Sequence, residues 1–251
     1  MDSEELLRRR LMDLADQSYR QNIFTYTGFL SMDELDLYER MKGELAYAAP
    51  RVWGGQEDCE RCMIGFGSEE QLGYPGDFPI CRMAAEPAAE KFAEAITHRD
   101  VLGALMHLGI ERSLIGDILV REKKAWFFCT DAIAPYLAEN LTQIRRNRVR
   151  CAEVTGEVPE LTPILEPAVL NVASPRLDAV AAALTGQPRS RITSLLRERK
   201  VFVNGRCRES GSIQLAPGDV ISLRGYGKAV YDGVLGETKK GRCRVAVRRY
   251  C

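Results

Sequence analysis

The sequence predicts an α+β protein of three small domains, and three observations predict this class. The length of 251 residues leaves room for three small cores. Apolar residues follow helical spacing in some segments and strand-like alternation in others. Stretches rich in Gly and Pro at 67–77 and 156–173 separate these segments. We therefore expect an N-terminal α/β domain over 1–76, a middle domain over 77–156, a linker over 157–173 and a C-terminal domain over 174–251.

The N-terminal domain is expected to combine two helices with a hairpin. Leucines recur at helical spacing over 3–20, and Ser31 followed three residues later by Glu34 is a capping box that opens a second helix. The expected hairpin strands are 51–53 and 62–66. Up to Cys81 the chain has 8 basic and 16 acidic residues, which favours a docking or spacer role over a nucleic-acid surface.

The middle domain has the element order of a ferredoxin-like fold. The expected order is strand 79–85, helix 88–108 with an interruption near Thr97, strand 116–121, strand 124–129, helix 133–141 and strand 148–155. This βαββαβ arrangement is also the topology of the RNA-recognition motif, but topology by itself does not establish RNA binding. The Gly-rich aromatic octamer of a true RNA-recognition motif is absent from the sequence.

Two features of the middle domain bear on RNA. Trp126, Phe127 and Phe128 lie on one expected strand. Their rings either pack into the core at alternate positions, which we favour, or stack bases on an open sheet face. A run of arginines enters the last strand and lies either on a solvated edge or against phosphates. The arginines that we expect to contact RNA are Arg145, Arg146 and Arg148.

Motifs for other chemistry are weak. Cys59-x-x-Cys62 lacks a second pair of matched ligands, so we expect no metal site. His98-Arg-Asp100 lacks the D-F-G and Gly-rich loop of a kinase, so we expect it to open a helix. There is no G-x-G-x-x-G turn and no nucleophile–base pair, which predicts no cofactor, no catalytic residue and no enzyme. With neither a membrane-length apolar run nor a signal peptide, we expect a cytoplasmic protein.

The charge is divided unevenly along the chain. Residues 174–251 hold 16 Lys and Arg against 6 Asp and Glu, a net of +10, and residues 1–173 hold 19 against 29, a net of −10. A basic block beside an acidic remainder is typical of a nucleic-acid-binding module attached to another unit. The alternative, a basic domain that is merely soluble, stays open on charge alone.

The basic block is expected to present its cations from a pair of short helices. Ser174 and Pro175 suit the start of the first helix, and Ser190 suits the cap of the second, after a turn at 186–188. The expected strands are 201–203 and 220–223. Guanidinium groups match phosphate geometry, and a helix–loop surface can follow folded RNA by shape and charge. The expected RNA contacts here are Arg176, Arg189, Ser190, Arg191, Arg197, Lys200, Asn204 and Arg206.

This pattern resembles the S4-type RNA-binding domain. The matching residues are Arg176-Leu-Asp178, Ser190-Arg191, Leu195-Leu196, Val201-x-Val203-Asn204-Gly205 and Gly218-Asp219-x-Ile221. Arg199 departs from the pattern, because the family usually has Gly before the strand. The resemblance implies that 174–251 is an S4-like RNA-binding domain.

Nearly the whole chain resembles the YlmH-like family of bacterial S4-domain proteins. The segments that carry this resemblance are 98–110, 115–119, 220–227 and 238–241. It implies an RNA-binding protein that associates with ribosomal RNA of the large subunit and with tRNA, in rescue of stalled nascent-chain complexes, a form of ribosome-associated quality control. A rescue factor or a division protein is the implied protein partner, and we expect a monomer. Two alternatives stay open: an RNA-modifying enzyme or a division-linked scaffold protein carrying an S4 domain.

Overall fold

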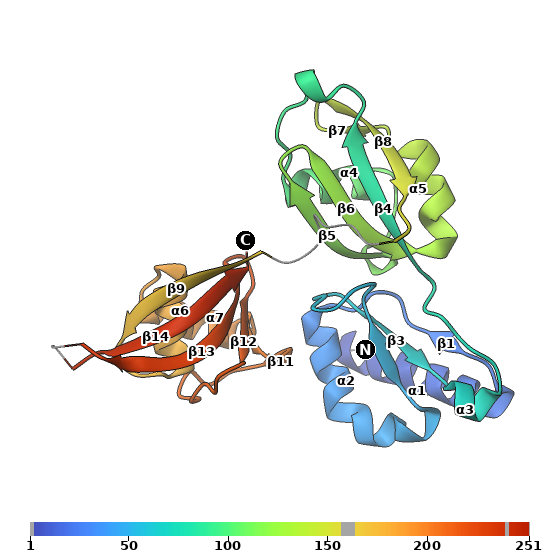
Figure 1. Ribbon diagram of the computed structural model, residues 1–251. Helices are drawn as coiled ribbons and strands as arrows, with labels where there is room; N and C mark the ends of the chain where they lie inside the picture. Colours follow the sequence, from blue (N-terminus) through green and yellow to red (C-terminus); the bar gives the residue numbers. More distant parts are fainter. Residues whose placement is uncertain (1–2, 157–163, 239–240, 251) are drawn as a thin grey trace. The chain divides into compact units, whose positions relative to one another are not determined.

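The computed structural model describes residues 3–156, 164–238 and 241–250, and the chain forms two compact units, 1–161 and 162–251 (Figure 1). The first unit contains two parts, which we call the N-terminal subdomain (3–76) and the middle subdomain (77–156). Both units mix helices with sheets, so the predicted α+β class is confirmed. No helix in the described ranges is long and apolar enough to cross a membrane.

The N-terminal subdomain packs two helices against a three-stranded sheet. Its elements are α1 (Ser3–Gln21), β1 (Thr25–Tyr26), α2 (Met32–Leu45), β2 (Arg51–Trp53), β3 (Met63–Phe66) and α3 (Glu69–Leu72). The two predicted helices and the predicted hairpin are present. The Glu34 carboxylate accepts a hydrogen bond from the Ser31 N–H at 2.6 Å, as a capping box requires. Strand β1 was not expected; it pairs Thr25 with Phe66 and completes the sheet order β1-β3-β2.

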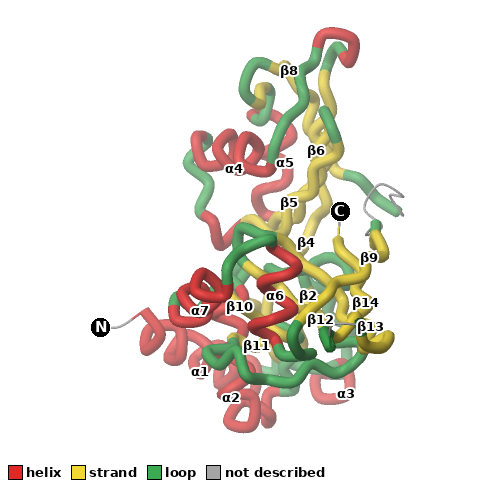
Figure 2. Tube along the Cα trace, turned by 90° about the vertical axis from the view of Figure 1, so that its left-hand side faces the viewer, coloured by secondary structure: helices red, strands yellow, loops and turns green. Residues whose placement is uncertain are grey.

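The middle subdomain has the predicted ferredoxin-like topology. Its elements are β4 (Ile80–Pro87), α4 (His98–His107), β5 (Ile115–Arg121), β6 (Lys124–Thr130), α5 (Ala134–Asn140), β7 (Gln143–Ile144) and β8 (Asn147–Glu153). The strands are antiparallel in the order β5-β6-β4-β8-β7, and Figure 2 shows α4 and α5 on one face of this sheet. The expected helix over 88–108 is wrong in its first part. Its start is fixed at His98, because the Asp100 carboxylate accepts the Thr97 N–H at 2.8 Å and closes a capping box.

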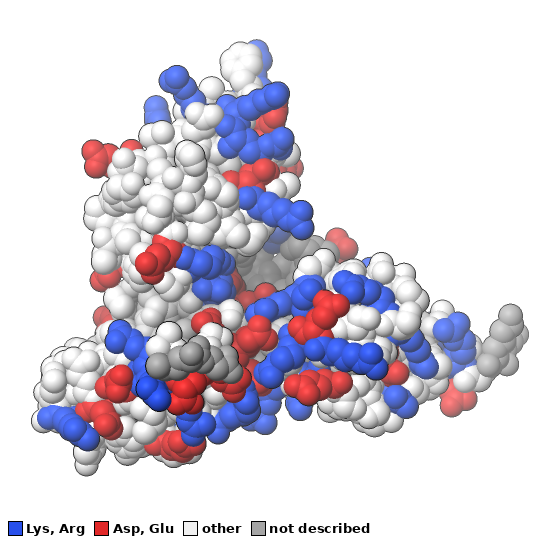
Figure 3. Space-filling model, turned by 180° about the vertical axis from the view of Figure 1, so that it is seen from behind, with Lys and Arg blue, Asp and Glu red and all other residues white. Residues whose placement is uncertain are grey.

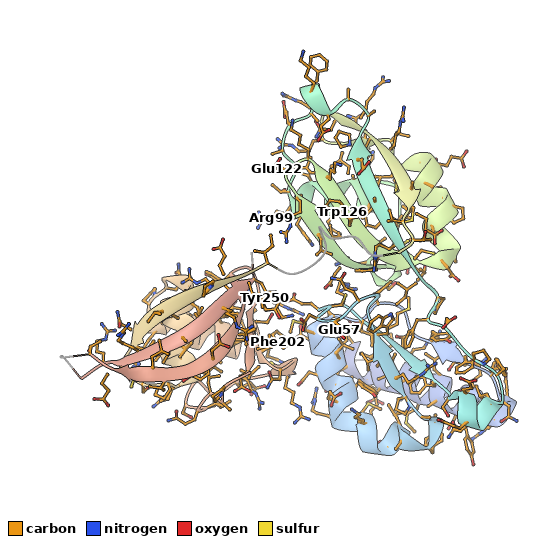
Figure 4. The ribbon with its side chains drawn as sticks, viewed as in Figure 1. Glu57, Arg99, Glu122, Trp126, Phe202 and Tyr250 are labelled. Carbon is orange, nitrogen blue, oxygen red and sulfur yellow. The ribbon has the colours of Figure 1, made fainter. Side chains whose placement is uncertain are left out.

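Aromatic side chains on β6 alternate between the two faces of the middle sheet. Phe127 is buried beneath the helices, in a core with Met83 and Leu105. Trp126, which Figure 4 labels, and Phe128 point to the opposite face, yet 4% and 1% of their surfaces are exposed. The favoured interpretation of core packing is confirmed, and these rings are too buried to serve as an open stacking surface.

A packed contact joins the two subdomains into one unit. Phe29 and Met63 of the N-terminal subdomain lie against Phe128 on the face of the middle sheet that the helices leave open. Gly55, at φ +104°, lies so close to Phe128 that an added Cβ would be 2.3 Å from the ring. Apolar side chains and a close backbone approach therefore seal this part of the boundary.

A polar network supports the same contact. Arg61 donates hydrogen bonds of 3.0, 2.7 and 3.1 Å to the carbonyl oxygens of Ile115, Phe29 and Arg112. The Asp117 carboxylate accepts the backbone N–H groups of Glu60 and Arg61 at 2.7 and 2.9 Å. Burial, and then the charge of Arg61, lowers the pKa of the Arg112 guanidinium to about 10. Because buried backbone groups need partners, these bonds fix how the two subdomains meet.

The C-terminal unit is a six-stranded antiparallel sheet with two helices on one face (Figure 1). Its elements are β9 (Leu165–Val172), α6 (Leu177–Thr185), α7 (Arg189–Arg197), β10 (Val201–Val203), β11 (Arg206–Cys207), β12 (Val220–Leu223), β13 (Gly227–Glu237) and β14 (Cys243–Tyr250). The strand order is β11-β10-β12-β13-β14-β9. Leu177 and Ile192 of the helices are fully buried against Tyr231 and Val245 of the sheet.

The expected linker over 157–173 is wrong in its second part. Residues 165–172 form β9, which pairs with β14 from Leu165 opposite Tyr250 to Val172 opposite Cys243. Pro167 is compatible with this strand because β9 lies at the edge of the sheet, where one row of N–H groups needs no strand partner. Residues 157–163 lie outside the described part of the chain.

Both helices of the C-terminal unit begin at other positions than expected. Pro175 does not open α6, because its carbonyl accepts the Leu215 N–H at 3.2 Å and the helix starts at Leu177. Helix α7 starts directly after Pro188, so Ser190 lies in its first turn and is not the cap. The start of α6 is displaced by backbone pairing between segments that are distant in the sequence. The start of α7 is set by Pro188, whose φ angle is fixed.

Candidate nucleic-acid interface

The outward side of α7 carries two arginines that have no partner among the residues that the structure describes. Ile192, Leu195 and Leu196 bury the inner side of the helix, and every fourth residue from Arg189 faces water. Ser190 is exposed beside this row, and we call Arg189, Ser190, Thr193 and Arg197 together the α7 stripe. Within the described residues, the guanidinium groups of Arg189 and Arg197 form no ion pair or hydrogen bond. Their five N–H donors each are open to a phosphate.

Two further predicted cations share one carboxylate. Arg191 donates to Glu198 at 3.1 Å and Lys200 donates to its other oxygen at 2.7 Å. The Arg191 guanidinium also contacts the Tyr226 hydroxyl at 3.4 Å. The hydrogen bond from Lys200, and then the charges of Lys200 and Arg191, hold the pKa of Glu198 below its usual range. Arg191 and Lys200 therefore add one net positive charge to this face, because Glu198 neutralises the other.

Arg176 is also paired within the domain. It directly precedes α6, and its guanidinium lies 3.2 Å from the carboxylate of Asp178, whose side chain is 17% exposed. The same carboxylate accepts the N–H of Ala179 at 2.9 Å. An RNA phosphate would have to compete with Asp178 for this arginine.

Asn204 has an internal role. It occupies the left-handed region at φ 53° in the turn before Gly205, a conformation that asparagine tolerates. Its amide donates to Asp219 at 2.8 Å and accepts the Val220 N–H at 2.8 Å, which ties two turns together. Arg206, two residues later, is exposed at the start of the edge strand β11.

Arg199, the departure from the S4 pattern, adopts the backbone that the usual glycine would adopt. Its φ is +55°, and the N–H groups of Arg199 and Lys200 close the end of α7 on the carbonyls of Leu196 and Leu195 at 3.1 and 2.8 Å. The turn is therefore kept without glycine. A left-handed arginine costs about 1 kcal/mol relative to glycine.

The three predicted arginines of the middle subdomain do not share one face. Arg145 and Arg146 form the β7–β8 turn and lie 3.5 Å from Asp100 and 3.9 Å from Glu94. Arg148 is exposed on β8, where its buried neighbours in the chain point toward the helices and it points away. The turn pair and the sheet arginine could therefore contact different stretches of a nucleic acid.

Tyr226 contacts Arg191 on this face and is not among the residues predicted from the sequence. It lies in the Gly225-Tyr-Gly227 turn, is 40% exposed and supports Arg191. A tyrosine between two glycines is a detectable signal, because such turns present their middle side chain to solvent. In Figure 3 Lys and Arg side chains lie over much of the C-terminal unit, with a few acidic side chains among them.

The cysteines of the C-x-x-C pair engage the backbone. The thiols of Cys59 and Cys62 contact the carbonyl oxygens of Gly54 and Cys59, both at 3.4 Å. Across the ranges that the structure describes, no group of three His, Cys, Asp or Glu side chains is arranged to hold a metal ion.

Known families and relatives match both parts of this arrangement. Residues 76–157 match the model described as "Putative RNA-binding domain in YlmH", and residues 175–221 match the S4 domain. The chain is 35% identical over 242 residues to "Ribosome-associated protein quality control protein P2" of Bacillus subtilis (strain 168), across 94% of this chain and 90% of the relative. A solved structure, "Cell division protein ylmH from Streptococcus pneumoniae", is 20% identical with a TM-score of 0.49, across 62% of this chain and 93% of that one. The chain thus belongs to the YlmH-like family of S4-domain RNA-binding proteins.

Proposed function

We propose that this protein binds ribosomal RNA of the large subunit together with tRNA, and that it works in ribosome-associated quality control on stalled nascent-chain complexes. Two features support this: the Bacillus relative is named for ribosome-associated quality control, and the C-terminal unit has an S4 domain with a net charge of +10 over 174–251. The proposal places the protein in the cytoplasm as a monomer, with a rescue factor or a division protein as a further partner.

The α7 stripe is the observation that carries the proposal. Arg189 and Arg197 stand two helical turns apart on one side of α7, about 12 Å along the axis, which exceeds the spacing of neighbouring phosphates. They can therefore contact two phosphates, or the two sides of a groove, without first breaking an ion pair with any described residue. Phosphate contacts of this kind supply affinity and orientation, and shape selects folded RNA.

The paired cations extend the same surface. When a phosphate approaches Arg191 and Lys200, it exchanges with a carboxylate that is itself exposed to water, so the cost of the exchange is small. Arg176 contributes less to RNA binding than Arg191 and Lys200, because its partner Asp178 is less exposed than Glu198. We assign Arg145, Arg146 and Arg148 to a second, weaker RNA contact of the middle subdomain.

Co-sedimentation with purified large ribosomal subunits tests the proposal. The double variant Arg189→Gln/Arg197→Gln is expected to lose most of its association. The matched control is Arg9→Gln/Arg20→Gln on α1, which removes the same charge from exposed positions in the acidic part of the chain and is expected to bind normally. Equal binding by both double variants would remove the α7 stripe from the interface.

Two further measurements separate the other functions. A complex with a protein partner that survives nuclease treatment would favour the division-linked scaffold over the RNA-binding role. S-adenosylmethionine binding, or a change in the modification of bulk rRNA, would indicate an RNA-modifying enzyme. We expect the complex to require RNA and the rRNA to be unchanged.

A further inference from the structure

A groove of about 710 Å³ opens in the first unit, at the boundary between its two subdomains. Its walls come from β2 of the N-terminal subdomain and from β4 and the residues after β8 of the middle subdomain. The lining side chains that matter here are Arg51, Trp53, Asp77, Arg82, Phe128 and Glu153. This volume is in the range of small-ligand sites, roughly 300–1,000 Å³.

Arg51 is held in place on one wall. Its guanidinium carbon lies 5.4 Å from the ring centre of Phe24 and 5.6 Å from that of Phe78. One of its N–H groups donates to the Gly76 carbonyl at 2.9 Å. The side chain nevertheless belongs to an exposed strand, so its remaining donors face the groove and solvent.

Arg82 is held on the opposite wall in the same way. Its guanidinium lies 5.5 Å from the ring centre of Phe128 and donates to the Gly156 carbonyl at 2.7 Å. Its Nε–H is buried and has no hydrogen-bond partner within the described residues. A buried donor without a partner destabilises the free protein.

Trp53 adds an aromatic surface beside the two arginines. It is the last residue of the edge strand β2 and is 40% exposed, unlike Trp126, which is 4% exposed. Large aromatic side chains gain by burial, and an exposed indole that lines a groove next to arginines is a typical stacking surface for a base.

Asp77 and Glu153 identify the class of ligand. They make the groove neutral by count, with two arginines against two carboxylates. Inorganic phosphate or an acidic peptide would meet these carboxylates as like charges. A nucleotide also carries a negative phosphate, which pairs with a guanidinium, but its base in addition offers N–H donors to a carboxylate and a flat face to Trp53.

We propose that this groove binds one or two nucleotides of single-stranded RNA, with a base stacked on Trp53 and the backbone phosphates paired with Arg51 and Arg82. The site is separate from the α7 stripe and does not depend on it. It would give the first unit, acidic as a whole, an RNA contact in addition to the one assigned to Arg145, Arg146 and Arg148.

Fluorescence of Trp53 tests this site directly. The chain has two tryptophans, so Trp126→Phe leaves Trp53 as the sole reporter. The probes are hexanucleotides of A, C, G and U, too short to represent a folded ribosomal RNA. Saturable quenching by at least one of them is expected. Quenching by none of them at millimolar concentration would overturn the proposal.

Substitutions in the full-length chain locate the contacts. Arg51→Met and Arg82→Met, made in the Trp126→Phe background, are each expected to raise the Kd for the oligonucleotide about tenfold or more, because each removes a charged hydrogen-bond donor. Arg82→Lys keeps the charge and the fold but loses the planar fork, and it is expected to bind with intermediate affinity. Arg40→Met on α2 is the matched control, expected to bind normally. Unchanged affinity in both groove variants would refute the assignment.

The Arg189→Gln/Arg197→Gln variant distinguishes the two RNA sites. It is expected to bind hexanucleotides normally while losing large subunits. Oligonucleotide quenching that disappears with the α7 stripe would place the binding there and refute the groove site. If ribosomal proteins from which nuclease has removed the RNA quench Trp53, and no RNA does, the groove is a protein-binding site and the proposal is refuted.

Discussion

The salt dependence of large-subunit binding is the sharpest test of the α7 stripe. Arg189 and Arg197 have no internal partner within the described residues, so each can neutralise one phosphate and release its counterion. Each neutralised phosphate steepens the plot of log affinity against log salt by about 0.7–0.9. The variant Arg189→Gln/Arg197→Gln is therefore expected to bind with a slope shallower by about 1.4–1.8. Between roughly 50 and 200 mM KCl its affinity should fall about tenfold less than that of the unaltered chain.

The assay is a titration of labelled protein with purified large subunits at several KCl concentrations. The variant should bind much more weakly at low salt, and the two affinities should converge as salt increases. The control Arg9→Gln/Arg20→Gln should keep the original slope, since it removes charge away from the interface. A loss of affinity with an unchanged slope would refute the reasoning, because it would mean that these arginines act through the fold and not through phosphates.

Glu198→Gln provides the opposite perturbation at the same face. It releases Arg191 and Lys200, which lie 3.1 and 2.7 Å from the Glu198 carboxylate, for contact with phosphates. We expect tighter binding and a steeper salt slope, because up to two more counterions are displaced. Weaker binding by this variant would show that the ion pairs orient the two cations for RNA and that free side chains are less effective.

The remaining predictions concern stability and reactivity. Gly55→Ala should cost about 2–4 kcal/mol in urea denaturation, because the Cβ would be 2.3 Å from Phe128 at a φ of +104°; Gly43→Ala on α2, with nothing within 4 Å, should be neutral or stabilising. Arg199→Gly should raise the free energy of unfolding by up to about 1 kcal/mol, because φ is +55° at this position and glycine adopts such a φ without strain. A lower melting temperature of this variant would show that Arg199 is not strained. Burial, and then the hydrogen bond with Glu153, raises the pKa of Cys81 from 9.0 to about 11, so alkylation at pH 8 should be slow and Glu153→Gln should accelerate it. The folded state binds the Cys81 thiol proton more tightly than the unfolded chain does. The contribution of this proton to stability is therefore complete below about pH 9 and is lost as the pH rises toward 11.

The regular elements were largely predictable because their signals are local. The Ser31 capping box, the βαββαβ order of the middle subdomain and the strand over 201–203 were all found near their expected positions. The exceptions are informative. Residues 165–172 contain a proline and lack a strong strand pattern in the sequence. They form a strand because they pair with β14 along their whole length.

The charge division, the S4 pattern and the paired helices are properties that the sequence by itself determined, because periodicity, capping and motif spacing act over a few residues. Which cations are free was decided by the tertiary structure. Glu198 pairs with two of the expected contacts, Arg191 and Lys200, and neutralises one of their two charges, whereas Arg189 and Arg197 have no partner among the described residues. The groove likewise unites Arg51 and Arg82 across the subdomain boundary. Such pairings depend on packing between residues distant in the chain, which local patterns do not encode.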